Sequence, residues 1–493
     1  MGMHLPALQV VIPLMAAGFA LLAWRPRLSW TVAMAASIAS FLISAQLLRQ
    51  VLADGPISYN LGGWEPPWGI EYRIDALNAF VLFLVSLIAV VVTPFALRSV
   101  EQEIAAPRIP FFYAAWLLAL AGLLGIAITG DLFNVFVFLE ISSLAAYALI
   151  SMGSDRRALS AAFRYLIVGS VGATFIVIGI GYLYVMTGTL NMADLAGRLP
   201  DVADQRPVIV GFAFLAVGIC LKLALFPLHL WLPNAYTYAP SAATPFIAAT
   251  YTKVAVYMLL RVFFTVFGES FSFDLMRLDA VILPLALIGI VSMSLVAIFQ
   301  PDLKRMLAYS SVAQIGYMIL GISFGSVTGL TAATLHMFNH AIMKGALFMA
   351  VGCMVYRLES SRIEDLAGVG RRMPLTMGAF LIGGLSIIGV PLTAGFISKW
   401  YLVLGAIERG WWPVAAVVLF GSLLAVIYIW RIVEVAYFRA PADGTATERV
   451  EAPLLLLVPT WILALANLYF GIDASLTTSA ASAAASAVLG GGP

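Results

Sequence analysis

Three lysines lie deep inside apolar stretches of this 493-residue chain. Lys222 stands about fifteen residues into one apolar run, Lys253 about eleven into the next, and Lys399 lies in a later run. A charged lysine at the centre of a bilayer costs from about 2.5 to over about 10 kcal/mol. Snorkelling to the headgroups ordinarily explains such a lysine, but Lys222 and Lys253 are too deep for it. Because a lysine removed from water gives up its proton more readily, these positions predict a hydrated proton path inside a membrane.

Helix-breaking residues accompany two of these lysines. Pro227 follows Lys222, and Gly389 and Pro391 precede Lys399. Proline removes a backbone donor and clashes with the preceding turn, so a helix that contains it must kink or open. Opened backbone is tolerated at membrane depth only against protein or water. The breaks therefore favour a water-lined path over a purely structural placement of the lysines.

A carboxylate also occurs at membrane depth. Glu140 lies in GDLFNVFVFLE, nine residues after Asp131, which begins the same apolar run. A bare carboxylate in a bilayer is either protonated or paired. One interpretation is a protonated Glu140 that only supports packing. The interpretation we favour is an ion pair with Lys222, in which each group biases the proton affinity of the other.

His336, His340 and Lys344 are spaced by four residues, which places them on one stripe of a helix. Histidine gains or loses a proton near neutral pH, as a relay requires. We predict this role for His336, whereas a structural role is an equal alternative for His340. No third ligand stands at a suitable spacing, so no metal site is predicted. His229, close to Pro227, is expected to act either as a gate or as a cap for the broken helix.

The elements that carry these residues are apolar runs long enough to cross a bilayer. We therefore expect an all-α polytopic membrane protein with about 14 transmembrane helices. The runs are residues 5–24, 29–53, 73–99, 111–129, 131–151, 158–186, 207–231, 242–268, 279–300, 304–325, 328–356, 373–407, 411–438 and 452–473. The first run is read as a helix and not as a signal peptide, because no cationic segment precedes it.

The Lys and Arg residues of the loops predict the orientation. With the N-terminus outside, 16 of them fall in inside loops and 6 in outside loops. Positive charge favours the inside, so we expect both termini outside. The loop from Asp54 to Asp75, with Trp64 and Trp68, is expected at the headgroup level. The Ala-, Ser- and Gly-rich tail after Thr477 is expected to be disordered.

The chain also shows signs of internal duplication, which is common in transporters. Asp131 opens the fifth predicted span and Asp302 opens the tenth, and the seventh and twelfth spans are both broken. We predict two inverted five-helix repeats, each with a broken helix. The expected organisation is residues 1–110 for helices 1–3 and the interfacial loop, 111–270 and 271–440 for the two repeats, and 441–493 for helix 14 and the tail.

Composition excludes several classes of protein. The chain is 62% hydrophobic and 11% charged with a formal net charge of +2, so a nucleic-acid partner is excluded and the lipid bilayer is the expected surrounding. Cys220 and Cys353 are the two cysteines, and they form no CxxC pair or cluster-binding set. No cofactor is predicted, and any redox centre must lie in another protein.

Several motifs together resemble a known family over about residues 70–435. They are GDLFNVFVFLE, CLKLALFPLHLWLPNAY, TKVAVYMLLR, KRMLAYSSVAQIGYM, HMFNHAIMKGALF and GVPLTAGFISKW. They are similar to the antiporter-like subunits of respiratory complex I and of Mrp-type multisubunit cation/proton antiporters. Lysine at position 399 and about 14 spans resemble the D subunit of the Mrp type most, whereas PLHLWLP, with His229, is similar to complex I.

The resemblance implies a proton path across the middle of the membrane through Glu140, Lys222, Lys253, His336 and Lys399. It implies a subunit of a hetero-oligomeric Na⁺/H⁺ antiporter in a bacterial inner membrane, with protons and Na⁺ as the transported ions, and not an enzyme. Three alternatives stay open. They are a proton-pumping subunit of a complex I-like or membrane-bound hydrogenase complex, a non-conducting scaffold subunit, and a stand-alone solute carrier.

Overall fold

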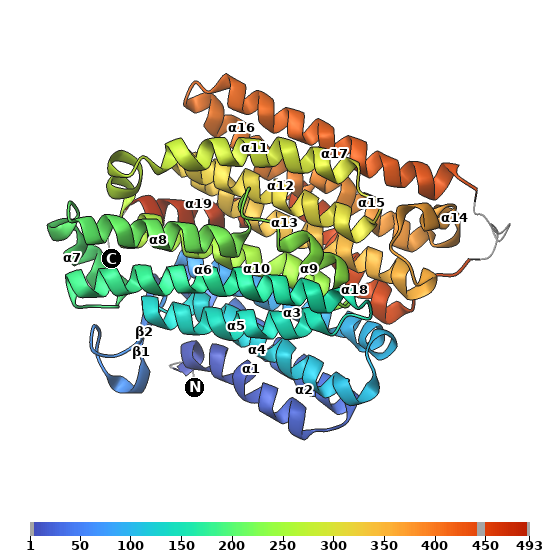
Figure 1. Ribbon diagram of the computed structural model, residues 1–493, viewed down its shortest axis with the longest axis horizontal. Helices are drawn as coiled ribbons and strands as arrows, with labels where there is room; N and C mark the ends of the chain where they lie inside the picture. The colour runs from blue at the N-terminus through green and yellow to red at the C-terminus, as the bar shows by residue number, and fades with distance from the viewer. Residues whose placement is uncertain (1–3, 441–448, 491–493) are drawn as a thin grey trace.

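The protein, in a computed structural model that describes residues 4–440 and 449–490, is nearly all helical (Figure 1). In this part of the chain, 13 helices are long and apolar enough to cross a membrane. They correspond to 13 of the predicted spans, and the predicted twelfth span is the pair α15 (Pro374–Ile388) and α16 (Ala394–Glu408). The protein is therefore a multi-pass membrane protein, as predicted.

The remaining elements follow in chain order. The N-terminal part holds α1 (Leu5–Leu22), α2 (Pro26–Asp54), the antiparallel strands β1 (Ile57–Asn60) and β2 (Glu71–Ile74), and α3 (Ala76–Glu103). Next come α4 (Ile109–Ile128), α5 (Leu132–Ser151), α6 (Arg157–Thr187), α7 (Met192–Arg198), α8 (Arg206–Leu223), α9 (Leu232–Tyr238) and α10 (Ala243–Leu260). The second half holds α11 (Leu278–Ile298), α12 (Leu303–Ser323), α13 (Val327–Leu358), α14 (Val369–Arg372), α17 (Trp412–Phe438), α18 (Leu454–Ile472) and α19 (Ser475–Leu489).

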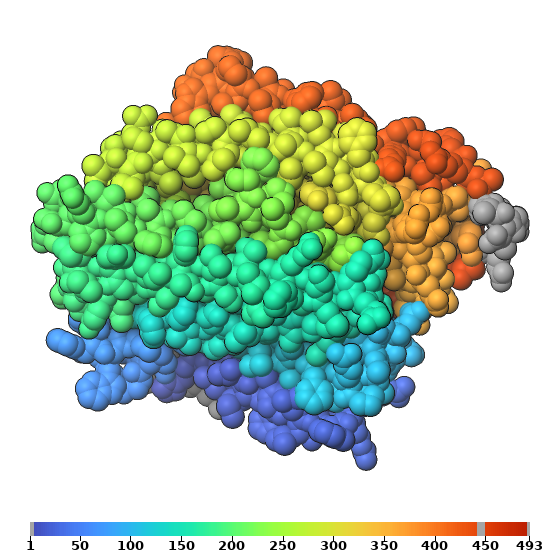
Figure 2. All heavy atoms as spheres, viewed as in Figure 1, coloured from blue at the N-terminus to red at the C-terminus, as the bar shows by residue number. Residues whose placement is uncertain are grey.

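The long helices run roughly alongside one another, and three of them form the centre of the molecule (Figure 1). Nearly every side chain of α10, α12 and α13 is buried. In contrast, α6 and α17 expose apolar side chains such as Phe163 and Leu419. Figure 2 shows that side chains fill the space between the ribbons on the viewed face. A helix that is apolar all round belongs in a core or a bilayer, so any polar group on the central helices is costly unless it is paired.

The predicted interfacial loop contains a short β-hairpin, which the sequence interpretation did not include. Ile57 pairs with Ile74 and Asn60 with Glu71. Trp64 and Trp68, between the strands, are 71% and 91% exposed, as suits aromatic residues at a membrane–water interface. We call the end of the molecule that carries β1, β2 and α7 the hairpin face, and the end that carries α14 the opposite face (Figure 1).

The prediction that the tail after Thr477 is disordered was wrong. Ser475–Leu489 form α19, which packs against α13 and α3. Its buried side chains include Ala481 and Ala484. Small side chains let helix backbones approach closely inside a membrane protein, so a composition typical of flexible tails here serves packing.

Both described ends of the chain lie at the hairpin face. His4 Nδ1 lies 2.9 Å from the hydroxyl of Tyr59 in the hairpin. At the other end, Leu489 lines a cavity together with Glu71 of the second strand. An even number of membrane crossings places both ends of a chain on the same face. The position of this face outside the cell stays a prediction.

A matching pair of backbone bridges occurs at the two faces. One joins the starts of α5 and α7, and the other joins the start of α12 to the segment before α14. Their hydrogen bonds are Leu132 N to Leu190 O (2.9 Å), Met192 N to Gly130 O (2.8 Å), Leu303 N to Ser361 O (2.8 Å) and Ile363 N to Pro301 O (2.9 Å). Every residue of the second set follows its counterpart by the same number of positions. The two inverted repeats stay a prediction, and this recurrence at opposite faces supports it.

An ion pair joins Asp75, the residue directly before α3, to Arg261, the residue directly after α10. Asp75 caps α3 by accepting from the amides of Leu77 and Asn78, and its carboxylate also binds the Arg261 guanidinium. Burial raises the pKa of the Asp75 carboxyl, but the pair with Arg261 and the cap hydrogen bonds outweigh it, so the net pKa lies below its ordinary value.

Asp75→Asn is therefore expected to lower the stability of the protein at neutral pH by about 3 kcal/mol, because Arg261 loses its counter-charge while asparagine still caps the helix. The lowered pKa means that Asp75 stabilises the protein above the ordinary carboxyl pKa, and that this contribution is lost as pH falls through the lower, folded-state value. Thermal denaturation of both proteins should show a constant difference from pH 8 to pH 5 that narrows below about pH 4. A difference that does not change with pH would show that the charge is not responsible.

Candidate functional site

Lys222 and Glu140 lie side by side where α8 ends inside the molecule. Lys222 Nζ is 3.8 Å from Glu140 Oε1 and donates to Ser143 Oγ at 2.9 Å. The Lys222 side chain is 4% exposed, whereas that of Glu140 is 30% exposed. The structure thus brings the predicted partners together, with the carboxylate near the molecular surface and the lysine inside.

The break of α8 comes directly after Lys222, since the helix ends at Leu223. Ala224 adopts a left-handed conformation with φ 61°, and α9 begins only at Leu232. The last carbonyl groups of a helix have no partner within it. Here the indole of Trp231 donates to Leu221 O at 3.0 Å. The capping role considered for His229 is therefore filled by Trp231, and His229 is buried beside Phe226, with a ring-centroid distance of 5.6 Å.

A small cavity with a mixed polar and apolar lining separates Lys222 from α10. Its volume is about 20 Å³, and Lys222, Ser142, Ser143 and Tyr251 line it. This volume admits one water molecule, which needs polar partners of this kind. Lys253, on α10, is completely buried, and its Nζ donates to Ala248 O and, at 3.3 Å, to Thr252 Oγ1.

The stripe of α13 continues the line of polar groups, since α10 packs against α13. The two ring nitrogens of His336 lie 2.9 Å from Gln314 Oε1 and 2.9 Å from Ser398 Oγ. The ring of His340 stacks parallel to that of His336 with centroids 6.1 Å apart. Among the described residues, neither nitrogen of His340 has a hydrogen-bond partner. His336 therefore lies in a hydrogen-bonded chain, and His340 lies beside it.

Lys344 and Lys399 are held by carbonyl groups and serines. Lys344 Nζ donates to Leu307 O at 2.8 Å and to Ser310 Oγ at 2.9 Å. Lys399 Nζ donates to Ile387 O (2.8 Å), Ile388 O (3.0 Å) and Ser422 Oγ (2.8 Å), and lies 4.9 Å from the centre of the Tyr317 ring.

The partners of Lys399 follow from the second helix break. α15 ends at Gly389, which has φ 87°, so its final carbonyls are free to bind a cation. The negative end of a helix dipole also favours a positive charge there. Ser398, the residue before Lys399, connects α16 to the histidine stripe, because its hydroxyl contacts His336. Polar groups thus lie at intervals from Glu140, through the centre, to Lys399.

Asp131 lies apart from this line. Its carboxylate accepts from the amide of Asn134 at 2.7 Å and caps α5. In the described part of the chain, no group of three or more His, Cys, Asp and Glu side chains is placed to hold a metal ion.

Sequence reasoning missed the polar groups that hold the titratable side chains. Gln314 and Ser398 contact His336, and Ser422 receives a hydrogen bond from Lys399. Gln314 had a recognisable signal, as an amide within the apolar stretch MLAYSSVAQIGYMILGIS. The serines had none, because serine is common in transmembrane helices.

A polar cavity of about 500 Å³ lies at the opposite face. Asp155, Tyr238, Asp302 and Lys304 are among its lining residues. Lys304 is 7% exposed, and its Nζ donates to Ser241 Oγ at 3.0 Å, just before the start of α10. This cavity brings the solvent of the opposite face to the end of the helix that carries Lys253.

Comparison with known proteins places this arrangement in a family. The family model for the NADH:quinone oxidoreductase/Mrp antiporter transmembrane region matches residues 129–425. The chain is 44% identical to NADH-quinone oxidoreductase subunit N of Desulforudis audaxviator, over 96% of each chain. It is 30% identical to the D subunit of the Na(+)/H(+) antiporter of Alkalihalophilus pseudofirmus, over 92% of each chain.

A solved structure shows the same likeness to one chain of an assembled complex. In the membrane-bound sulfane sulfur reductase, an archaeal respiratory membrane complex, one chain superposes with a TM-score of 0.90 at 32% identity, covering 98% of this chain and 97% of that one. These relatives are subunits of multi-subunit membrane complexes, so this chain is an antiporter-like subunit with hetero-oligomeric partners. The chain belongs to the NADH:quinone oxidoreductase/Mrp antiporter transmembrane family.

Proposed function

We propose that this subunit conducts protons across the membrane along the buried line from Lys222 to Lys399. The observation that carries the proposal is the spacing of protonatable groups between the two helix breaks. Lys222, Lys253, His336 and Lys399 are each at most 6% exposed, and serines, threonines or carbonyl groups contact them. Charges this costly are retained inside a membrane protein when ions or protons use them.

Entry and exit follow from the places where solvent and helix breaks approach this line. Protons pass between the opposite face, near His229 or Lys222, and Lys399 by way of Lys253 and His336, in the direction that the host complex drives them. The Lys and Arg residues predicted for the inside loops include Arg157, Lys304 and Arg362, which belong to the opposite face. We therefore place that face in the cytoplasm and the hairpin face outside a bacterial inner membrane.

The Glu140 and Lys222 pair couples this path to a neighbouring subunit. Glu140 is the more exposed member, so a charge arriving beside it from outside acts on it first. Loss of the carboxylate's attraction frees Lys222 to release its proton towards the cavity and Lys253. Gain of that attraction holds the proton on Lys222.

As the host complex we propose a multisubunit Na⁺/H⁺ antiporter, in which proton influx along this path drives Na⁺ efflux elsewhere. The 30% identity to the D subunit of such an antiporter, over nearly the whole chain, supports this host. A second host is favoured by the 44% identity to an NADH-quinone oxidoreductase subunit N. In that host, electron transfer in a partner supplies the energy, and the same path pumps protons outward.

The first experiment measures Na⁺-dependent dissipation of an imposed pH gradient in everted vesicles of an antiporter-deficient bacterium that expresses the whole operon. Wild type is compared with Lys222→Ala and Lys399→Ala. Both variants are expected to assemble and to lose exchange down to the level of vesicles without the complex, because each interrupts the only path proposed.

Three results would change this conclusion. Exchange that survives in assembled variants would make the subunit a scaffold. A wild type that shows no cation-dependent exchange, but builds a pH gradient when an electron donor is supplied, would assign the redox-driven host. Transport of an organic solute that both lysine variants abolish would favour a solute carrier.

A further inference from the structure

A charged cavity beneath the hairpin has no part in the path described above. It has a volume of about 490 Å³ and lies between the hairpin, α7, the end of α10 and the last turn of α19. Its lining includes Glu71, Arg73, Asp75, Arg261 and Glu269. Tyr257 also borders it but is only 2% exposed, because the Arg261 guanidinium lies over its ring, 5.3 Å from the centre. At about 30 Å³ per water molecule this volume holds more than ten, so the hairpin face has a hydrated pocket that reaches down to α10.

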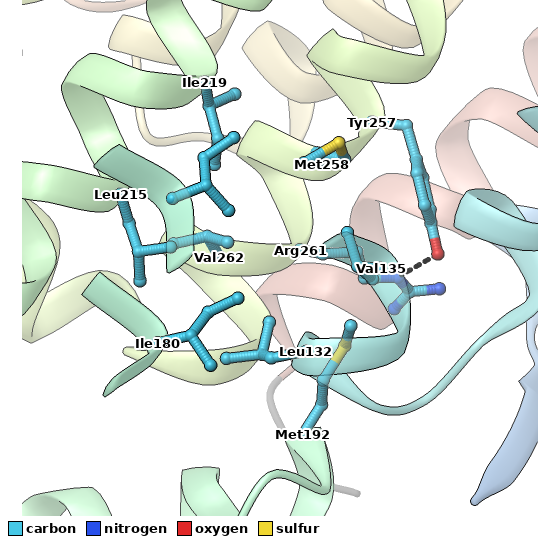
Figure 3. Close-up of a pocket in the computed structure, with 11 residues that line it drawn as sticks. Leu132, Val135, Ile180, Met192, Leu215, Ile219, Tyr257, Met258, Arg261 and Val262 are labelled. Carbon is cyan, nitrogen blue, oxygen red and sulfur yellow. Dashed lines mark hydrogen bonds between the residues drawn. The ribbon is translucent and has the colours of Figure 1, made fainter. Parts of the chain in front are cut away.

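The floor of this cavity is an ion pair. Arg261 Nη2 lies 2.5 Å from Asp75 Oδ1, and the two side chains are 9% and 18% exposed. Arg261 also donates through Nε to the hydroxyl of Tyr257 at 3.0 Å, as Figure 3 shows. That hydroxyl in turn donates to Ala127 O at 2.9 Å. Arg261 is therefore fixed from both sides.

The residues under the cavity lead to the central lysine. Lys253, Tyr257 and Arg261 follow one another at intervals of four, which places them on one face of the helix. Arg261 lies about two turns, or about 12 Å, along the helix axis from Lys253. The ion pair thus stands between a solvent-filled cavity and the helix face that carries Lys253.

The lateral side of this stripe is apolar. Leu132, Ile180, Leu215 and Val262 lie on one side of Arg261 in Figure 3, and with Arg261 and Tyr257 they line a residual space of about 10 Å³. Since charged species do not cross apolar packing, the polar route from the stripe is towards the hairpin face.

We propose that the cavity is an aqueous vestibule through which the hairpin face gains access to Lys253, and that the Arg261 and Asp75 pair is its gate. This inference rests on the proposed proton path, to which it adds a second outlet. In the closed state the fixed guanidinium repels cations that approach Tyr257, as positive groups do in selective pores. Separation of the pair lets Arg261 swing into the cavity and uncovers Tyr257, which is 2% exposed while the pair is closed.

Cysteine accessibility tests the vestibule without relying on transport. The assembled complex carries Cys220→Ala and Cys353→Ala, both at buried positions, and one new cysteine at a time. Thr265→Cys reports the open cavity, Tyr257→Cys reports the position that Arg261 covers, and Glu65→Cys reports the exposed hairpin. Leu259→Cys, on the far side of the same helix and fully buried, is the matched control. A charged, membrane-impermeant thiosulfonate is added to right-side-out and to everted vesicles.

Glu65→Cys and Thr265→Cys are expected to react in the same vesicle orientation and not in the other. Tyr257→Cys is expected to react slowly with the pair intact and about tenfold faster, or more, with Asp75→Asn or Arg261→Lys, because each variant weakens a charge-assisted hydrogen bond. If Asp75→Asn does not assemble, Arg261→Lys, which retains the positive charge, tests whether weakening the pair speeds the labelling. Leu259→Cys should stay unreactive throughout.

Three outcomes would overturn the proposal. They are a Thr265→Cys that reacts from neither side, a Tyr257→Cys rate that the gate variants leave unchanged, and a Leu259→Cys rate that rises with that of Tyr257→Cys. If the expected labelling occurs in a complex that moves no protons in vesicles, the proposed function fails and the vestibule stands. If protons move but the labelling is absent, the vestibule alone fails.

Discussion

Vesicles that contain the complex with Lys253→Met are expected to show no proton movement above that of vesicles without the complex. Lys253 lies on α10, between the cavity beside Lys222 and the histidine stripe of α13, and it is completely buried. Methionine has a similar length but no proton to exchange. Because replacing a buried charge by an apolar side chain of similar volume is often neutral or stabilising, the complex should still assemble. The measurement is the rate at which a pH gradient forms or decays, relative to the amount of assembled complex.

Thr250→Val is the matched control for this experiment. Thr250 is one turn before Lys253 and also fully buried, but its hydroxyl donates to Phe246 O at 2.7 Å within its own helix. Removing that hydroxyl leaves the line of lysines intact, so transport should stay near the wild-type rate. Wild-type transport by Lys253→Met would show that protons bypass α10 and would contradict the proposed path.

Gly395→Ala is expected to destabilise the protein by about 3 kcal/mol, near the upper end for overpacking. A methyl group at this position would lie 1.8 Å from Ser386 O and 2.8 Å from Met343 Cε. The amide of Gly395 also donates to Ser386 Oγ at 3.1 Å. The two halves of the broken helix therefore meet where no side chain fits, and alanine must push them apart beside Lys399. The measurement is the midpoint of thermal unfolding of the purified complex.

Gly181→Ala provides the comparison. Gly181 lies within α6, where an added methyl group would meet nothing within 4 Å. Alanine favours a helix over glycine by up to about 1 kcal/mol, so this variant should unfold at the same temperature as wild type or slightly higher. Equal effects of the two substitutions would refute the close contact at Gly395.

The transmembrane helices could be predicted because the thickness of a bilayer fixes how long an apolar run must be. The two breaks could be predicted from Pro227, Pro391 and Gly389, whose backbone properties act locally. The hairpin was missed because each of its strands has only four residues. α19 was missed because its folding into a helix depends on packing against α13 and α3, whose surfaces accommodate its small side chains.

For the candidate site, the useful signal was the energetic cost of placing an ionisable side chain at membrane depth. Lysines and a glutamate at membrane depth stand out in a sequence, and the structure brings Lys222 and Glu140 to 3.8 Å. Their neutral partners do not stand out, since Ser398 and Ser422 become partners only when α16 approaches α13 and α17. His229 stood out as a titratable residue, with a gate and a cap as open alternatives, but it is the indole of Trp231 that donates to the last turn of α8. The host complex could not be identified from the sequence either, because both kinds of complex contain the matched region.

The position of α19 has a practical consequence for anyone who purifies this protein. Its last turn, Ala487 to Leu489, forms part of the rim of the cavity beneath the hairpin. An affinity tag or fluorescent protein fused to the C-terminus is therefore anchored at the mouth of that cavity. The same fusion at the N-terminus is attached near His4, which contacts Tyr59; neither residue lines the cavity. Activity of a C-terminally tagged complex should accordingly be compared with that of an N-terminally tagged one before a loss of transport is attributed to any substitution.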